Sequence, residues 1–194
     1  MIDVKNECDI SPVLRPFIGK LVSIFGSARV SEDSHYYKET YAISKKFAKK
    51  GFKILTGGGG GVMEAGNRGA FEIGIESIGL NVKLPHEQNM NPYVSLGFHF
   101  YDYALRKEYL MKYSQYFVIA GGGFGTFDEV GEVLEKLQHG KLQNGVKIFF
   151  LDTKFHEPIE NFLQQMLSEK MICKKDLENI HFVDGEDELF SLIS

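Results

Sequence analysis

Cysteine is scarce in this chain of 194 residues, which holds only Cys8 and Cys173 and no CxxC pair. Two separate cysteines cannot build a disulfide framework or a cysteine zinc cluster, so we interpret them as incidental thiols of a reducing compartment. The six histidines are scattered, without HxxH or HxxxH spacing. We therefore expect no metal site.

Long apolar runs and basic runs are also missing. The longest apolar stretches, residues 116–120 and 148–151, have the length of strands, whereas a membrane helix needs about 20 residues. The first nine residues carry acids and lack the apolar core of a secretory signal. Lys and Arg number 22 against 26 Asp and Glu, a net charge of -4, and no five-residue basic run occurs. We expect a cytoplasmic location and neither a membrane nor a nucleic acid as partner.

The composition, 43% hydrophobic and 25% charged, is typical of one globular domain. From residue 20 onward, short β-rich runs alternate with longer helical patterns. This alternation predicts an α/β fold in which helices cover a mostly parallel sheet. We assign residues 20–194 to this single domain and interpret residues 1–19 as a loosely attached N-terminal arm.

Hydrophobic periodicity places the individual elements. Strands are expected at residues 21–25, 52–55, 76–82, 116–120, 147–151 and 181–183. Helices are expected at residues 34–50, 62–73, 101–114, 127–139, 157–170 and 186–193. Residues 83–97 have no clear period and contain two prolines, so we interpret them as a loop.

Two glycine-rich turns each separate an apolar strand from a helix. The first spans residues 56–61 (TGGGGG) and the second residues 121–126 (GGGFGT). Consecutive glycines permit positive φ angles and a close approach of a ligand to the backbone. Free amides and the helix dipole at the start of a helix attract an anion. A tight strand-to-helix connection would explain one such turn, but two in one small domain indicate a phosphate or nucleotide site.

The common motifs of other nucleotide enzymes and hydrolases are absent. The sequence contains no GxxxxGK[ST] and no GxSxG, and neither glycine turn fits GxGxxG. A P-loop NTPase, an ordinary dinucleotide dehydrogenase and a serine hydrolase are therefore not favoured. Open α/β sheets bind ligands beyond the carboxyl ends of their strands, where the strand order reverses. Both glycine turns leave such ends, so one crevice can use both.

Four charged side chains near these turns each have two interpretations. Glu129 follows Thr126 by three residues, which is the spacing of a capping box, yet its carboxylate would also lie at the rim of the crevice. Glu64 either complements the dipole of its own helix or faces the ligand. Arg106 and Lys107 either belong to a solvated helix face or contact the ligand. The residue pattern leaves these alternatives open.

Four stretches of the chain resemble the LOG family of cytokinin riboside 5'-monophosphate phosphoribohydrolases, long mislabelled as lysine decarboxylases. They are residues 24–29 (IFGSAR), 56–70 (TGGGGGVMEAGNRGA), 106–107 (RK) and 122–129 (GGFGTFDE). The resemblance covers about residues 20–190. It implies a Rossmann-like three-layer sandwich, a homodimer, and hydrolysis of a cytokinin riboside or purine nucleoside 5'-monophosphate to free base and ribose 5-phosphate. We expect the reaction to need no cofactor.

Carried over by position, the resemblance implies that Arg106 and Glu129 are catalytic. Glu129 would stabilise an oxocarbenium-like state and orient water, and Arg106 would hold the nucleotide. The glycine turns and the resemblance together give the candidate contacts to the nucleotide: Ser27, Gly58, Gly59, Glu64, Lys107, Gly122, Gly123, Gly125 and Thr126. Gly121 and Gly60 stand where family members often carry proline, and glycine loosens both loops.

Other functions remain compatible with these residues. A non-catalytic nucleotide-binding or sensor protein would keep the crevice and cleave nothing. An amino-acid decarboxylase would need a lysine that forms a Schiff base with pyridoxal phosphate, and only Lys107 is near the proposed site. Residues 101–113 carry more large apolar side chains than one buried stripe needs, so we expect part of this segment to form the dimer surface.

Overall fold

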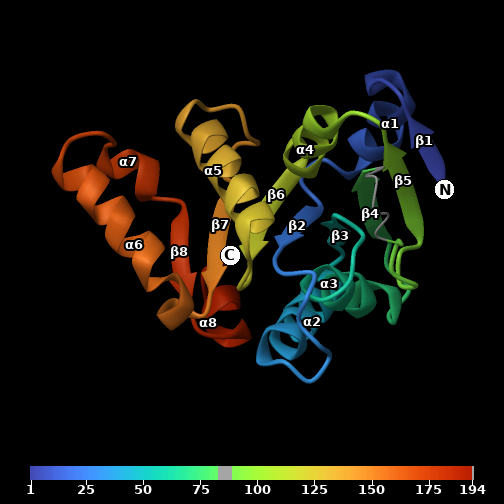
Figure 1. Ribbon diagram of the computed structural model, residues 1–194, viewed down its shortest axis with the longest axis horizontal. Helices are drawn as coiled ribbons and strands as arrows, with labels where there is room; N and C mark the ends of the chain where they lie inside the picture. Colours follow the sequence, from blue (N-terminus) through green and yellow to red (C-terminus); the bar gives the residue numbers. More distant parts are fainter. Residues whose placement is uncertain (83–88, 194) are drawn as a thin grey trace.

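The structure, a computed structural model, describes residues 1–82 and 89–193. These residues form an eight-stranded sheet in the order β1-β5-β4-β3-β2-β6-β7-β8, in which every pairing is parallel. Helices lie on both faces of the sheet (Figure 1). The predicted α/β class and the three-layer sandwich are confirmed, and the sheet is wholly rather than mostly parallel.

Each strand and helix predicted between residues 21 and 193 has a counterpart, with ends that differ by a few residues. The strands are β1 (Ile2–Val4), β2 (Leu21–Phe25), β3 (Lys53–Thr56), β4 (Ser77–Val82), β5 (Leu96–Phe100), β6 (Ser114–Ile119), β7 (Lys147–Leu151) and β8 (Ile180–Val183). The helices are α1 (Glu7–Leu14), the 3-10 turn η1 (Arg15–Phe17), α2 (His35–Lys49), α3 (Val62–Phe71), α4 (Tyr103–Met111), α5 (Phe124–Gln138), α6 (Thr153–Ser168), α7 (Lys174–Leu177) and α8 (Glu186–Ser191).

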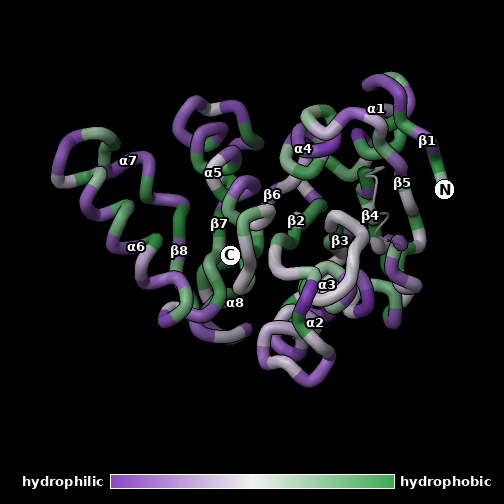
Figure 2. Tube along the Cα trace, in the orientation of Figure 1, coloured by the Kyte–Doolittle hydropathy of each residue, from purple (hydrophilic) through white to green (hydrophobic). Residues whose placement is uncertain are grey.

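Two hydrophobic cores lie on opposite faces of the sheet. One packs α1, α4 and α5 against side chains such as Phe25 and Phe117. The other packs α2, α3 and α8 against side chains such as Ile24 and Phe149. Alternate residues of one strand therefore enter different cores, because successive side chains point to opposite faces. Hydrophobic stretches of the tube coincide with strands that have neighbours on both sides, such as β7 (Figure 2).

The N-terminal residues are not the loosely attached arm that we expected. β1 extends the sheet by pairing with β5, and Val4, Ile10 and Leu14 are completely buried. β5 was itself missed, since its first residues fell in the predicted loop 83–97; residues 83–88 of that loop lie outside the described residues. The physical reason for both errors is that β1 is only three residues long and β5 mixes apolar residues with Gly97 and His99, so pairing with neighbouring strands rather than local propensity fixes them.

The strand order reverses between β2 and β6. From β2 the chain proceeds outward through β3, β4 and β5, whereas β6, β7 and β8 follow in the opposite direction. Phe25 of β2 pairs with Ile119 of β6, so the segments after these two strands begin side by side. A ligand crevice is expected at this point of an open α/β sheet.

Candidate active site

A cavity of about 550 Å³ lies at this switch point. It is lined by Gly26 and Ser27 after β2, Gly57 after β3, Asn81 at the end of β4, and Gly123 before α5. The rest of the lining includes Met63 of α3 and residues from the first two turns of α4 and α5. Its volume falls in the range of small-molecule sites. The predicted meeting of both glycine turns at one crevice is therefore observed.

Helix α5 begins three residues earlier than predicted. Its N-cap is Gly123, no side chain caps it, and the Phe127 amide donates to the Gly123 carbonyl at 2.9 Å. Thr126 is therefore already helical, and its side chain lies against Gly122. The predicted capping box between Thr126 and Glu129 does not exist, because Glu129 lies in the second turn, too far along to reach the cap. Among the described residues no side chain caps the first amides of α5, so they can bind an anion.

Ser27 joins the two glycine turns through its backbone. Its amide donates to the Gly121 carbonyl at 3.0 Å, and its carbonyl accepts from the Val62 amide at 3.0 Å. Gly61 has a φ of 61°, and an added Cβ there would meet the Ser27 carbonyl oxygen. This position therefore requires glycine, because both the backbone angle and the space exclude a side chain.

A buried network of polar side chains holds the backbone of the first glycine turn in place. The Asn67 amide oxygen accepts from Thr56 Oγ1 at 2.7 Å and from Asn91 Nδ2 at 2.9 Å. The Gly58 amide donates to Thr56 Oγ1 at 2.9 Å, and Asn91 Nδ2 also donates to the Gly59 carbonyl at 2.9 Å. Buried polar groups that are satisfied in this way hold one conformation.

The cavity contains an ion pair between two helices. Arg106 Nη1 of α4 lies 2.8 Å from Glu129 Oε1 of α5, and Arg106 Nε donates to the Leu80 carbonyl at 3.1 Å. Both residues are 8% exposed. The guanidinium also lies against Gly57, where a Cβ would collide with it. The interpretation of Arg106 as part of a solvated helix face is wrong, because the glycine turn makes room for its burial.

Burial and charge act on Glu129 in opposite directions. Removal of the carboxylate from water raises the pKa of Glu129, and the neighbouring Arg106 offsets part of that rise. A carboxylate that is desolvated on one side and open to a cavity on the other is a candidate for acid–base or electrostatic catalysis.

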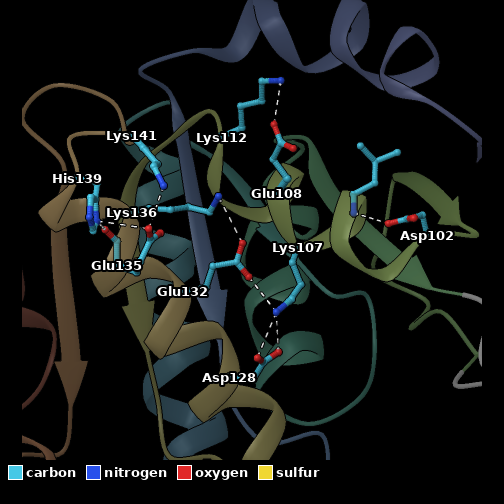
Figure 3. Close-up of polar contacts among 11 residues, drawn as sticks. Asp102, Lys107, Glu108, Lys112, Asp128, Glu132, Glu135, Lys136, His139 and Lys141 are labelled. Carbon is cyan, nitrogen blue, oxygen red and sulfur yellow. Dashed lines mark hydrogen bonds and ion pairs between the residues drawn. The ribbon is translucent and has the colours of Figure 1, made fainter.

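Lys107 lies outside the cavity lining. Its ammonium nitrogen is 2.9 Å from Glu132 Oε2 and 3.1 Å from Asp128 Oδ2, both on α5. Figure 3 shows this lysine directed at the two carboxylates, within a series of ion pairs that continues along α5. Hydrogen bonds to these partners raise the pKa of Lys107. The residue links α4 to α5 and thereby supports the Arg106–Glu129 pair.

The other predicted contacts divide into two groups. Ser27, Gly123, Gly125 and Thr126 line the cavity together with Arg106 and Glu129. Gly58, Gly59, Glu64, Lys107 and Gly122 are not among its lining residues. Glu64 instead accepts a hydrogen bond from the Tyr37 hydroxyl at 3.1 Å. Gly58 (φ 75°) shapes the first turn rather than facing the cavity.

The glycine at position 121 has a structural explanation. Atoms of the Tyr36 ring lie 2.7 Å from where a Cβ of Gly121 would stand. Burial, together with a hydrogen bond to Asp152, raises the pKa of Tyr36 to about 12. Tyr36 thus packs on the start of the second glycine turn and occupies space that a proline ring would need. The loosening that we expected from Gly121 is opposed by this contact.

The chain is similar in sequence to a known protein family. A family model described as "Possible lysine decarboxylase" matches residues 63–193, which is more than half of the chain. The chain belongs to this family, the LOG family. An uncharacterized protein of Archaeoglobus fulgidus is 28% identical over 116 residues, which cover 59% of this chain and 74% of the relative.

Solved structures share the fold of this LOG-family chain. The protein TM1055 matches with a TM-score of 0.67 and 22% identity over 90% of this chain and 98% of its own. The molybdenum cofactor carrier protein of Chlamydomonas reinhardtii matches with a TM-score of 0.67 and 21% identity over 89% of this chain and 94% of its own. At these identities the likeness is one of fold alone.

The name of the family model suggests pyridoxal phosphate chemistry, which requires a lysine in the site. Among the described residues, no lysine lines the cavity of this LOG-family protein, and Lys107 is engaged by two carboxylates. These residues do not fit a Schiff-base cofactor. The described residues include no group of three or more His, Cys, Asp or Glu side chains that could hold a metal ion. None of the described helices has the length and apolarity needed to cross a membrane.

Sequence reasoning missed several cavity residues. Arg29 follows β2, Asn81 lies at the end of β4, and Tyr103 and Phe124 begin α4 and α5. Arg29 lies in the segment after β2, and the other three lie near the carboxyl end of a strand or at the first residue of a helix. The position of β2 at the switch point was the available signal for Arg29, because the segment after this strand must border the crevice.

Proposed function

We propose that the protein hydrolyses the N-glycosidic bond of a nucleoside 5'-monophosphate and releases free base and ribose 5-phosphate. A cytokinin riboside or purine monophosphate is the proposed substrate. The observation that carries the proposal is the buried Arg106–Glu129 pair, which shares one cavity with the free amides at the start of α5. The pair supplies charge for the reacting bond, and the amides supply a site for the phosphate.

Cleavage of the N-glycosidic bond requires a negative charge close to the positive charge that develops on the ribosyl ring. As the C1'–N bond breaks, its electron pair leaves with the base and positive charge grows on the ribosyl ring. The Glu129 carboxylate stabilises that charge and orients a water molecule, from which it accepts a proton while the oxygen bonds to C1'. The departing base takes up a proton from solvent, and Glu129 afterwards returns its proton to solvent, so one water molecule is consumed in total. Arg106, which is too basic to act as the acid, holds Glu129 and the nucleotide in place.

The phosphate supplies binding energy at a distance from the reacting bond. Gly123, Gly125 and Thr126 line the cavity at the start of α5, where amides and the helix dipole favour an anion. Remote binding energy of this kind can hold the ribosyl carbon against the catalytic carboxylate. This reaction uses no cofactor.

A phosphate requirement tests this arrangement. We expect kcat/KM for AMP to exceed that for adenosine by about 100-fold or more, since charge-assisted hydrogen bonds to a phosphate are each worth about 1.5–3 kcal/mol. Chromatography of free adenine from parallel reactions measures the ratio. Equal release from both compounds would contradict the role assigned to the start of α5.

A non-catalytic nucleotide-binding protein is the alternative. It would use the same cavity and the same free amides, and it would keep Arg106 and Glu129 for recognition. The two functions differ in one observable, because a binding protein holds AMP and releases no base.

We propose that the chain forms a homodimer through the face beside the cavity. In residues 101–113, part of which we expected to form the dimer surface, Tyr109, Leu110 and Met111 are buried in the chain's own core and do not contribute to such a surface. Exposed aromatics remain nearby: Tyr103 is 45% exposed and Phe124 is 95% exposed, and both line the mouth of the cavity. Exposed aromatic side chains at one site are typical of an interface.

The dimer has a direct test in solution. We expect light scattering at micromolar concentration to give twice the chain mass of 21.9 kDa. The Phe124→Ser variant should lower this mass, because it removes the most exposed aromatic of the patch. Exposed Phe162 of α6 lies elsewhere on the chain, and Phe162→Ser is the control. A parent mass of one chain would refute the dimer.

A further inference from the structure

Two cations line the cavity among the described residues, Arg29 and Arg106. The charge of Arg106 is already matched by Glu129 at 2.8 Å. Arg29 is exposed, and its guanidinium has no ion-pair or hydrogen-bond partner among the residues that the structure describes. The cavity therefore holds one matched pair of charges and one unmatched positive charge.

The backbone at Arg29 is tied to both glycine turns. Its amide donates to Ser27 Oγ at 3.1 Å. Ser27 in turn binds the Gly121 carbonyl with its amide and the Val62 amide with its carbonyl. Arg29 is thus held in a fixed place relative to the start of α5, while its long side chain stays free to move toward a ligand.

A nucleoside 5'-monophosphate brings more negative charge than α5 can balance. A phosphate monoester carries about -1.5 to -2 at neutral pH, with a second pKa near 6. The start of a helix contributes a charge equivalent to roughly +0.5. The remaining charge needs a cation, and guanidinium groups bind phosphate oxygens in a bidentate manner.

We propose that Arg29 is a specificity-determining residue that recognises the phosphate monoester dianion and selects nucleotides over nucleosides. This inference rests on the proposed function, in that it names the ligand group of the same cavity. Arg29 supplies the counter-charge, and the amides of Gly125 and its neighbours supply the remaining hydrogen bonds. Arg106 stays with Glu129 at the reacting bond.

The experiment measures affinity by calorimetry at fixed ionic strength for three probes: AMP, ribose 5-phosphate and adenosine. The Arg29 and Arg15 variants are made in the Glu129→Gln protein, in which slowed turnover leaves AMP intact during the titration. We expect Arg29→Gln to weaken AMP and ribose 5-phosphate by about 10- to 100-fold and to leave adenosine unchanged. Arg29→Lys should recover part of the loss, since it keeps the charge without the planar fork. Arg15→Gln, at an exposed arginine in η1, is the matched control.

The possible results separate this inference from the hydrolase proposal. If the parent protein binds AMP and releases no base, the hydrolase proposal fails, while the affinities of the Arg29 variants still decide the present inference. Equal AMP affinity in Arg29→Gln and Arg15→Gln would overturn it. So would a loss shared by AMP and adenosine with ribose 5-phosphate unchanged, because Arg29 would then contact the base. A parent that binds none of the three probes would overturn both.

Discussion

We expect the Glu129→Gln variant to release base from AMP about 100-fold or more slowly than the parent protein, while its affinity for AMP is retained. Glutamine keeps the size of the side chain, and its amide oxygen can still accept the hydrogen bond from Arg106 Nη1. It lacks the negative charge that stabilises a ribosyl cation and the basicity that activates water, each a contribution of this order. In the proposed arrangement the phosphate is bound by Arg29 and backbone amides, so we expect binding not to depend on Glu129.

A neighbouring glutamate provides the matched control for this variant. Glu135 lies further along α5 and pairs with Lys141 at 2.9 Å, outside the cavity lining. Glu135→Gln removes the same charge from the same helix and should change base release by less than about threefold, as expected for an exposed ion pair. Full activity in Glu129→Gln, measured beside this control, would return Glu129 to a structural role.

The second large effect concerns Arg106→Met. Loss of the guanidinium leaves the Glu129 carboxylate buried and without its partner, which costs about 3 kcal/mol of unfolding free energy at neutral pH. We also expect base release to fall by about 100-fold or more, because the cavity loses both a fixed charge and the support of the catalytic carboxylate. Urea denaturation and chromatography of free base measure the two effects.

The stability and activity of Arg106→Met should depend on pH differently from those of the parent protein. Burial already raises the pKa of Glu129 in the parent, and Arg106 is what limits the rise. Without Arg106 the folded-state pKa rises further above the unfolded value, so the native state binds the proton more tightly. The stability deficit of the variant therefore grows as pH rises toward its folded-state pKa of Glu129, and it shrinks in acid. Any residual activity should fall off on the acid side at a higher pH than in the parent, because Glu129 must be ionised to act.

Two further variants complete the test of the ion pair. Arg106→Met combined with Glu129→Gln should regain most of the lost stability, because no unpaired charge is left. Lys112→Met, directly after the same helix α4, breaks partly exposed pairs with Glu108 and Glu7 and should cost about 1 kcal/mol or less. A deficit in Arg106→Met that is independent of pH, or that persists in the double variant, would indicate lost packing rather than an unpaired carboxylate.

The parts of the fold that sequence predicts are those with their own local signal. Strands such as residues 147–151 contain a continuous apolar run of strand length, and helices such as residues 34–50 carry a clear period. β1 and β5 have no such signal, because each is held by its neighbour in the sheet. Gly97 inside β5 weakens the pattern further, yet an added Cβ there would stand 2.6 Å from Met90 Sδ. A side chain at this position would have to displace Met90, and such packing cannot be recognised in the local sequence.

The candidate site was predictable in outline and not in detail. The two glycine turns indicate an anion site at the switch point, and both turns do border the cavity. The spacing of Thr126 and Glu129 indicated a capping box that is not formed, since the helix starts at Phe124, directly after the glycines. Arg106 and Glu129 are 23 positions apart on two helices, and no local pattern reports that such side chains meet.

The most direct test of the account is the quantification of both products from AMP. Purified protein is incubated with AMP in metal-free buffer without added phosphate, and adenine and ribose 5-phosphate are measured together over time. The account predicts equimolar release of the two products by the parent protein and loss of both in Glu129→Gln. Tight AMP binding with neither product formed from any nucleoside monophosphate would contradict hydrolysis and leave the cavity as a binding site.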